Sequence, residues 1–524
     1  MSFPLLTATA VLPAVGAIAT AAVPAKRRTA AKWLALLFSL ATLVLAAVVA
    51  VRFDPGGGRF QLTESHAWIA DFGVRYELGV DGIGVALIAL TALLIPFVIL
   101  AGWHDADPQE TGSTRWRPTQ GFFALILLVE AMVIISFEAT DVFVFYIFFE
   151  AMLIPMYFLI GGFGDRAGPH GEKEAATQRS YAAVKFLLYN LVGGLIMLAA
   201  VIGLYVVAGT FSLSEIAEAR ASGSLDMATN TERLLFLGFF FAFAVKAPLW
   251  PLHTWLPNAM GEATAPVAVL ITAVVDKVGT FAMLRFCLQL FPEASKWATP
   301  AILVLALISI VYGALVAVGQ RDIKRLVAYA SISHFGFIIM GIFAMTSQGQ
   351  SGATLYMVNH GISTAALMLV AGFLISRRGS RLIADYGGVQ KVAPVLAGTF
   401  LIGSLATLSL PGLGPFVSEF LVLVGTFTRY PVIGIIATFG IVLAALYTLV
   451  LYQRTMTGPV KPSTEGIADL KVRELAVVVP LIGVLIFLGV YPKPVTELVN
   501  PAVKHTLSDV HKKDPKPEVE AAHK

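Results

Sequence analysis

A lysine followed by three prolines interrupts a long apolar run near the middle of the chain. Residues 244–257 read AVKAPLWPLHTWLP, so Lys246 is followed by Pro248, Pro251 and Pro257. A lysine at the centre of a bilayer costs about 2.5–3.5 kcal/mol on insertion scales, so it needs a partner or a water-filled cavity. Proline removes a backbone donor and breaks the helix at the same place. Because a broken helix survives at membrane depth only inside protein or along a wet path, this pattern predicts an ion-conducting interior.

The composition indicates a polytopic helical membrane protein. Hydrophobic residues make up 57% of the chain and charged residues 13%, whereas soluble domains are about one quarter charged. Runs of about 20 apolar residues mark the membrane spans. We therefore expect an all-α fold with fourteen spans, near residues 4–23, 33–52, 82–102, 120–138, 141–163, 180–208, 232–257, 263–290, 298–319, 322–346, 351–376, 394–427, 431–454 and 474–492.

The basic residues of the loops are distributed unevenly between the two faces. If the loop after the first span faces the cytoplasm, twenty lysines and arginines lie on that side and seven on the other before the C-terminal tail. Cytoplasmic loops carry the excess of positive charge. Both termini are therefore expected on the outer side, although the tail after Tyr491, which holds six lysines, departs from the rule.

Several functions are excluded by what the sequence lacks. Cys287 is the single cysteine, which excludes an internal disulfide, a cysteine-ligated iron–sulfur cluster and CxxCH haem attachment. The sequence contains no GxxxxGK[ST] motif, so we expect no nucleotide hydrolysis by a P-loop. It has no basic and aromatic stripe of the kind that binds nucleic acid. We expect no cofactor and no metal on this chain.

With the charges of the loops and span ends set aside, ten ionisable side chains in the expected spans are candidates for a functional interior. Each lies on a different helix, except for three that share the span 263–290. Such side chains avoid lipid only if their helices pack around a common interior. The ten are Glu130, Glu150, Lys185, Lys246, Asp276, Lys277, Arg285, His334, His360 and Glu419.

Glu150 and Lys246 are expected to form a buried pair. Each would otherwise be an uncompensated charge, and breaking such a pair is costly. Separating the two would favour release of the lysine proton, which makes the pair suitable as a pumping element. The alternative is that Glu150 is only a buried structural hydrogen-bonding group.

Lys277 and two histidines could continue the pathway. Lys277 is in the middle of the next span, beside Asp276, whose own role is either in the pathway or in a helix contact. His334 and His360 lie in successive spans and have hydroxyl residues next to them. Imidazole titrates near neutrality and both donates and accepts protons. The pair predicts a proton relay, with structural hydrogen bonding and haem ligation as alternatives.

The remaining positions each have two interpretations. Glu419 follows a second helix breaker at 411–415 and is either an acid at the end of the pathway or a cap for freed amides. Glu130 is a second acidic partner or a structural residue. Lys185 belongs to the interior or snorkels to the surface. Arg285 is expected to be an interfacial anchor.

The two helix breakers lie in the seventh and twelfth expected spans, five positions apart, and an odd offset reverses the direction in the membrane. This is what an inverted repeat of five plus five helices produces. Four parts are expected: the first three spans in 1–118, the first repeat in 119–297, the second repeat in 298–455, and the last span with a polar tail in 456–524.

Three long motifs resemble subunit M of bacterial NADH:quinone oxidoreductase, the respiratory complex I. Residues 145–157 read FYIFFEAMLIPMY, 246–248 read KAP with HTWLP at 253–257, and 410–412 read LPG with FVSEF at 416–420. The resemblance implies an antiporter-like, proton-translocating subunit with fourteen helices and two inverted repeats. By motif it assigns the essential glutamate, the broken-helix lysine, the central lysine, the two connecting histidines, the exit-side acid and the accessory glutamate to Glu150, Lys246, Lys277, His334, His360, Glu419 and Glu130, in that order.

Two positions depart from the family pattern. Asn258 stands where aspartate is common, which puts a charge role in that loop in doubt, and Asp276 adjoins the central lysine, which it could retune. The rival interpretation is a subunit of a multisubunit sodium/proton antiporter, and a third is a scaffold that has lost conduction.

The resemblance also implies where such a chain works. It would lie in the bacterial inner membrane, next to other membrane subunits of complex I, including neighbouring antiporter-like subunits. FMN, iron–sulfur clusters and quinone would be held by partner subunits, so this chain would carry proton translocation and not the redox chemistry.

Overall fold

The computed structural model describes residues 3–107, 119–164 and 172–515. In this part of the chain, twelve helical segments are long and apolar enough to cross a membrane. They are α1 (Leu5–Ala22), α2 (Arg28–Arg52), α3 (Gly82–Ala101), α4 (Thr119–Glu138), α5 (Val142–Ala151) with α6 (Leu153–Phe163), α7 (Glu172–Ala208), α11 to α13 (Ala265–Leu290), α14 (Pro292–Val318), α15 (Ile323–Phe343), α16 (Ser347–Arg378), α20 (Pro431–Met456) and α21 (Val472–Val490).

Two further spans are interrupted, as the prolines predict. Helix α9 (Thr229–Lys246) is followed by α10 (Leu256–Glu262), and α18 (Pro394–Thr407) is followed by α19 (Gly414–Phe427). Together with the twelve continuous segments, they correspond to the fourteen expected spans. The predicted helical membrane fold is confirmed.

The expected all-α fold missed a β-hairpin and two polar helices. Strands β1 (Gln61–Ile69) and β2 (Val74–Val80) pair antiparallel in the segment between α2 and α3. Helix α8 (Leu213–Ala221) lies between α7 and α9, and α22 (Lys493–Asp509) follows the last span. These elements are too short or too polar to give a membrane-span signal. The remaining short elements are Ala70–Phe72, Ile383–Asp385 and α17 (Val389–Val392).

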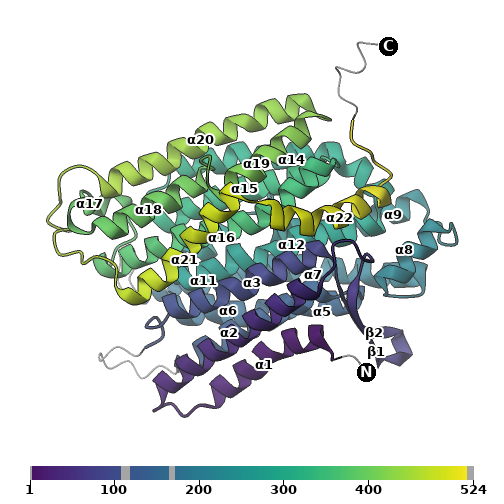
Figure 1. The fold of residues 1–524 in the computed structure, drawn as a ribbon, viewed down its shortest axis with the longest axis horizontal. Helices are drawn as coiled ribbons and strands as arrows, with labels where there is room; N and C mark the ends of the chain where they lie inside the picture. The colour runs from purple at the N-terminus through teal and green to yellow at the C-terminus, as the bar shows by residue number, and fades with distance from the viewer. Residues whose placement is uncertain (1–2, 108–118, 165–171, 516–524) are drawn as a thin grey trace.

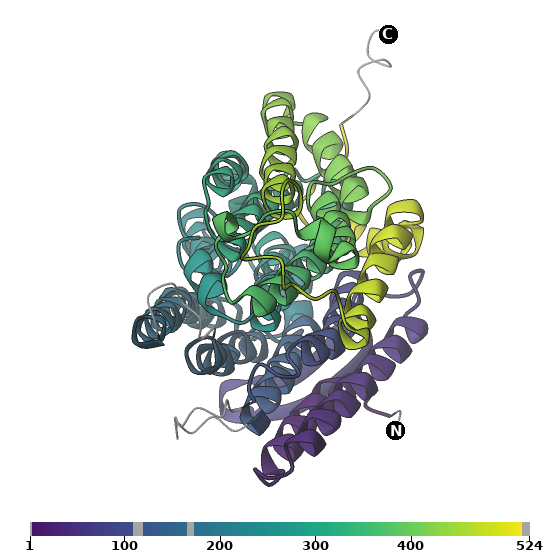
Figure 2. The same cartoon turned by 90° about the vertical axis from the view of Figure 1, so that its left-hand side faces the viewer.

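The helices differ greatly in how much of their surface is covered by protein. In the most apolar stretch of each span, the share of residues that are buried is 100% for α11 to α13, 94% for α15 and 89% for α16. It is 33% for α2, α20 and α21. Figures 1 and 2 show α1 and α2 along one side of the molecule and α20 at the other, with α15 and α16 between them. The spans that carry Lys277, His334 and His360 are therefore the innermost ones, as the insertion cost of charge requires.

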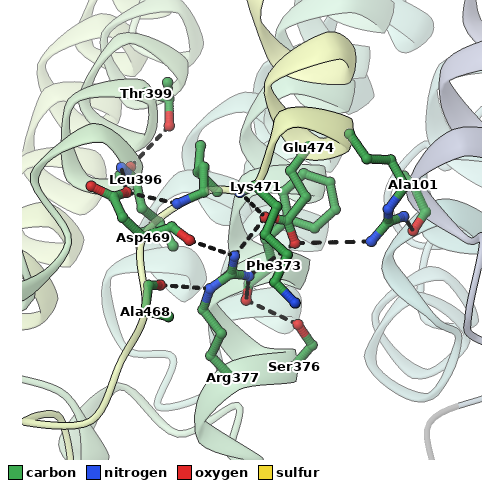
Figure 3. A network of polar contacts seen from close by, with 12 residues as sticks. Ala101, Phe373, Ser376, Arg377, Leu396, Thr399, Ala468, Asp469, Lys471 and Glu474 are labelled. Carbon is green, nitrogen blue, oxygen red and sulfur yellow. Dashed lines mark hydrogen bonds and ion pairs between the residues drawn. The ribbon is translucent and has the colours of Figure 1, made fainter.

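A polar network holds one end of the bundle together (Figure 3). Arg377, near the end of α16, pairs with Glu474 at 2.5 Å and donates to the carbonyl of Asp469 at 3.0 Å. The carboxylate of Asp469 accepts from the amide of Leu396 in the first turn of α18 at 2.8 Å. These contacts satisfy helix-terminal groups that would otherwise be unpaired. They fix the loop before α21 against the ends of α16 and α18.

Candidate proton pathway

The interruption between α9 and α10 places Lys246 inside the protein. Helix α9 ends at Lys246, and its last carbonyls are left without helical partners. The indole of Trp255 donates to the carbonyl of Val245 at 2.9 Å, and the amide of Trp250 donates to Ser309 Oγ at 2.8 Å. Side chains thus replace part of the hydrogen bonding that the prolines remove. Lys246 itself is 1% exposed.

Lys246 contacts the residue before Glu150 instead of Glu150 itself. Its Nζ donates to the carbonyl of Phe149 at 2.8 Å and lies 4.0 Å from the centre of the Phe149 ring. That carbonyl lies in the last turn of α5, which ends at Ala151. Glu150 Oε1 is buried and has no hydrogen bond within the described residues. The expected ion pair is therefore not formed in this conformation, although the two charges still interact electrostatically.

Glu150 lies against a glycine of the neighbouring helix. A Cβ atom at Gly194 of α7 would be 2.0 Å from Glu150 Oε1. No side chain fits at position 194 unless the carboxylate moves. The absence of a Cβ there gives Glu150 its place beside α7.

Lys277 lies at the centre of the bundle, on a segment of irregular helix. Helix α12 (Asp276–Ala282) is flanked by π-helical turns over Leu270–Val275 and Met283–Cys287. Such turns are frequent at functional sites. Lys277 is fully buried, its Nζ is 2.6 Å from His360 Nδ1, and it lies 4.2 Å from the centre of the Phe335 ring.

The two histidines are neighbours in the interior. The ring centres of His334 and His360 are 5.4 Å apart, and His360 Nε2 is 3.2 Å from Thr364 Oγ1. Each Nδ1 atom takes part in a hydrogen bond, that of His360 with Lys277 Nζ and that of His334 with the hydroxyl of Tyr356. Because the rings contact each other, there is no space for a haem between them. Haem ligation by the pair is therefore wrong.

A hydrogen-bonded chain continues from His334 to Glu419. His334 Nδ1 is 2.6 Å from the hydroxyl of Tyr356, which donates to Glu419 Oε2 at 3.1 Å. Ser409, at the break before α19, also donates to Glu419 Oε2. Glu419 is thus joined to the histidines through a tyrosine.

Tyr356 was missed by sequence reasoning, which looked for groups that are charged near neutral pH. The sequence did indicate that Tyr356 faces the interior, because Tyr356 and His360 are four residues apart on one helix and so share a face. Tyr447 was missed for the same reason, and its hydroxyl is 3.4 Å from His334 Nε2.

Three glutamate or aspartate side chains are buried with neither carboxylate oxygen hydrogen-bonded inside the described ranges. They are Glu130, Glu138 and Asp276. Asp276 interacts electrostatically with Lys277 and with Lys246. Glu130 is 0% exposed on α4, and within the described residues no hydrogen bond or ion pair joins it to Glu150 or Lys246.

Lys185 and Arg285 lie outside the central file, the row of buried residues formed by Lys246, Lys277, His360, His334, Tyr356 and Glu419. Lys185 Nζ donates to Asn258 Oδ1 at 3.0 Å, so the asparagine at the family's aspartate position holds this lysine. Arg285 was expected at the membrane interface, but it is 1% exposed and pairs with Asp81 at 2.8 Å. The interfacial assignment is wrong, because Asp81, which directly precedes α3, forms an ion pair with Arg285 inside the protein.

The chain is similar to known proteins over most of its length. Residues 139–444 match the family described as NADH:quinone oxidoreductase/Mrp antiporter, TM. The chain is 55% identical to NADH-quinone oxidoreductase subunit M of Mycobacterium tuberculosis, over 98% of this chain and 96% of that protein.

Two solved structures share the fold. The match to a chain of respiratory complex I from Thermus thermophilus with bound NADH has a TM-score of 0.84 and 30% identity, and covers 96% of this chain and 99% of that one. A chain of the Mrp complex from Dietzia sp. matches with a TM-score of 0.80 and 20% identity, over 98% and 100% of the two chains. The second likeness concerns the fold alone.

Proposed function

The chain belongs to the family of NADH-quinone oxidoreductase subunits M, and we propose from this that it moves protons across the membrane through the buried file from Lys246 to Glu419. It is an antiporter-like membrane subunit of an enzyme complex. The Mrp-type alternative is supported only by a shared fold at 20% identity.

One observation carries the pathway: ionisable side chains from four different spans meet in the protein interior. Lys277 contacts His360, and His334 contacts Glu419 through Tyr356. Charged groups buried this deeply are expensive and are retained where they conduct or pair. Each of these three contacts is short enough to pass a proton along a hydrogen bond.

The hydrogen bonds define a direction that can reverse. When Glu419 is ionised, Tyr356 donates to it and accepts from His334 Nδ1. When Glu419 gains a proton, the carboxyl group donates and Tyr356 can turn its hydroxyl proton toward His334. The donor and acceptor in each of these hydrogen bonds have then exchanged roles. This reversal is how a proton moves along a hydrogen-bonded file.

Transfer between the two histidines needs a further step. Their ring centres are 5.4 Å apart, so a proton crosses by rotation of one ring or through one ordered water molecule.

Glu150 and Lys246 form the switch at the other end of the file. Lys246 Nζ now donates to the carbonyl of Phe149, one residue from Glu150. A rotation of either side chain would bring ammonium and carboxylate together, and the reverse rotation would leave the lysine ready to lose its proton. Glu130 is proposed as an accessory carboxylate that adds to the negative charge near this switch.

The file crosses the boundary between the two proposed inverted repeats. Glu150, Lys246 and Lys277 lie in 119–297, and His334, His360 and Glu419 lie in 298–455. Residues 1–118 and 456–524 flank these units. The contact between Lys277 and His360 is then the point where one repeat passes the proton to the other.

The redox chemistry belongs to partner subunits in this proposal. FMN, iron–sulfur clusters and quinone would be bound there, and this chain would pack against other membrane subunits, including antiporter-like ones. Its place is the bacterial inner membrane, with both termini on the periplasmic side.

The pathway is tested by Glu419→Gln in the whole complex, reconstituted into proteoliposomes. We expect normal assembly and a lower number of protons pumped per NADH oxidised. Glu497→Gln is the matched control, because Glu497 is an exposed residue of α22 whose side chain, among the described residues, pairs with Lys493. An unchanged proton stoichiometry in Glu419→Gln would exclude Glu419, and the file that leads to it, from the proton pathway.

A further inference from the structure

Asp276 is a buried carboxylate that the pathway described so far does not use. It is fully buried, and neither of its oxygens has a hydrogen bond to any described residue. Buried polar groups are nearly always satisfied, and an exception needs an explanation. A carboxylate kept only for structure would be expected to cap a helix or to hold a partner. Asp276 does neither.

One face of α12 places Asp276 next to the end of α9. Asp276 and Gly279 are three residues apart and so share a face of the helix. A Cβ atom at Gly279 would be 2.9 Å from the amide nitrogen of Ala247 and 2.9 Å from the carbonyl of Phe243. The face that carries Asp276 is therefore packed against the last turn of α9, where Lys246 lies. The charges of Asp276 and Lys246 interact across this contact.

The neighbouring face of α12 is turned toward α16. Lys277 contacts His360, and Thr280, three residues further on, donates to Met357 Sδ at 2.9 Å. Adjacent helical positions point about 100° apart, so Asp276 and Lys277 face different helices. The aspartate therefore faces the end of α9 that carries Lys246, whereas the central lysine contacts His360.

We propose that Asp276 is a proton-carrying residue that links Lys246 to Lys277, an inference that rests on the proton pathway proposed above. In the first step the ammonium of Lys246 gives a proton to the Asp276 carboxylate, directly or through water, which leaves a neutral amine and a carboxylic acid. In the second step the acid gives that proton to the neutral amine of Lys277. Charge and protons balance, and no other reactant is needed.

The π-helical turn before Asp276 supports this role. Leu270–Val275 is π-helical and ends directly before the aspartate. A single π turn shifts the side chains that follow it around the helix axis. It therefore helps to set the two adjacent side chains toward α9 and α16, and mobility at this turn would let Asp276 approach each lysine in turn.

The first test compares Asp276→Asn with Asp276→Glu in the whole complex in proteoliposomes. Asparagine has nearly the same shape and cannot carry a proton, so we expect the proton-pumping rate to fall about tenfold or more. Glutamate keeps the carboxyl group and should keep pumping within about twofold of the unaltered complex. If Asp276 only fills space, asparagine will pump normally, because it breaks no hydrogen bond and removes an unpaired buried charge. That result would overturn the proposal.

A second measurement separates a proton carrier from a fixed counter-charge. Infrared difference spectra of the complex during NADH oxidation should contain a protonated-carboxyl band that is lost in Asp276→Asn. If asparagine impairs pumping but no such band depends on Asp276, the residue is a static charge and the proposal is wrong.

Lys277→Ala distinguishes this failure from a failure of the whole pathway. If Lys277→Ala pumps normally, the pathway itself is wrong. If Lys277→Ala pumps poorly and Asp276→Asn pumps normally, the pathway is supported and only the proposed role of Asp276 is excluded.

Discussion

The Nζ atom of Lys277 and the Nδ1 atom of His360 are 2.6 Å apart, and the two residues come from different proposed repeats. At this distance only one proton lies between the two nitrogens. If the ammonium donates, His360 Nδ1 accepts and the ring proton lies on Nε2, from which it can donate to Thr364 Oγ1 at 3.2 Å. Transfer of the shared proton leaves a neutral lysine and a charged imidazole. In the proposed pathway, this contact is where the proton is exchanged between the two repeats.

This contact predicts that arginine cannot replace Lys277. Lys277→Arg keeps the positive charge, but arginine does not deprotonate at accessible pH. We expect Lys277→Arg to impair proton pumping nearly as much as Lys277→Ala when both are measured in proteoliposomes holding the whole complex. A purely electrostatic role would tolerate arginine, so full pumping by Lys277→Arg would exclude proton exchange at this residue.

Glu150 and Lys246 should be needed for pumping and not for assembly. We expect Glu150→Gln and Lys246→Ala each to leave the complex assembled, to lower proton pumping and, if coupling is tight, to slow NADH oxidation. The physical reason is that each removes one of two buried charges that interact beside the broken helix. Assembly is followed by native gel electrophoresis and pumping by a pH-sensitive dye. Pumping at the level of the unaltered complex in either variant contradicts the switch.

Tyr356→Phe should interrupt the file between His334 and Glu419. The hydroxyl is within 2.6 Å of the imidazole and 3.1 Å of the carboxylate, and phenylalanine removes both hydrogen bonds without changing the ring. We expect pumping to fall by at least severalfold, with assembly retained. Tyr452→Phe, on the half-buried part of α20, is the control for loss of a tyrosine hydroxyl outside the file. If both variants pump equally well, the proton does not pass through Tyr356.

Gly194→Ala should displace the Glu150 carboxylate. The added methyl group would lie 2.0 Å from Glu150 Oε1, and the flexible end of a glutamate can move away. We expect the complex to assemble but to pump less, because the switch begins from a changed position. Gly398→Ala is the control, since a Cβ at position 398 meets nothing within 4 Å. Equal pumping by the two variants would show that the place of Glu150 beside α7 is unimportant.

The sequence could predict which residues are buried in the membrane but not which of them touch. A run of about 20 apolar residues locates a span, and the cost of inserting a charge directs Lys277, His334 and His360 inward, so the spans and the innermost helices were predictable. The rotation of each helix depends on packing, which a single sequence does not contain. For this reason the contact between Lys277 and His360 could not be foreseen, although both residues were named.

Two expectations failed for local reasons. A direct pair of Glu150 and Lys246 is expected only if a carboxylate is the sole acceptor available to the lysine. The last turn of α5 provides another acceptor, the carbonyl of Phe149. Arg285 was assigned to the interface from its position near a helix end. Its partner, Asp81, lies about 200 positions earlier in the sequence, directly after the missed hairpin.

The buried pair of Arg285 and Asp81 gives a prediction about stability. The two side chains are 1% and 4% exposed and 2.8 Å apart, and Asp81 also accepts from the amide of Gly84 at 2.8 Å at the start of α3. Removing one partner leaves an uncompensated buried charge, which costs about 3–5 kcal/mol. We expect Arg285→Met to lower the thermal stability of the purified complex markedly.

The double variant Arg285→Met with Asp81→Asn should recover most of that loss. Asparagine is neutral and still caps the start of α3, so no buried charge is left unpaired. Thermal unfolding of the single and double variants, followed under identical detergent conditions, measures the coupling between the two sites. If the double variant is less stable than Arg285→Met alone, the pair is not the reason for the loss. The packing of the arginine between Phe60 and Phe281, whose ring centres lie 4.7 Å and 4.8 Å from its guanidinium carbon, would then be the dominant contribution.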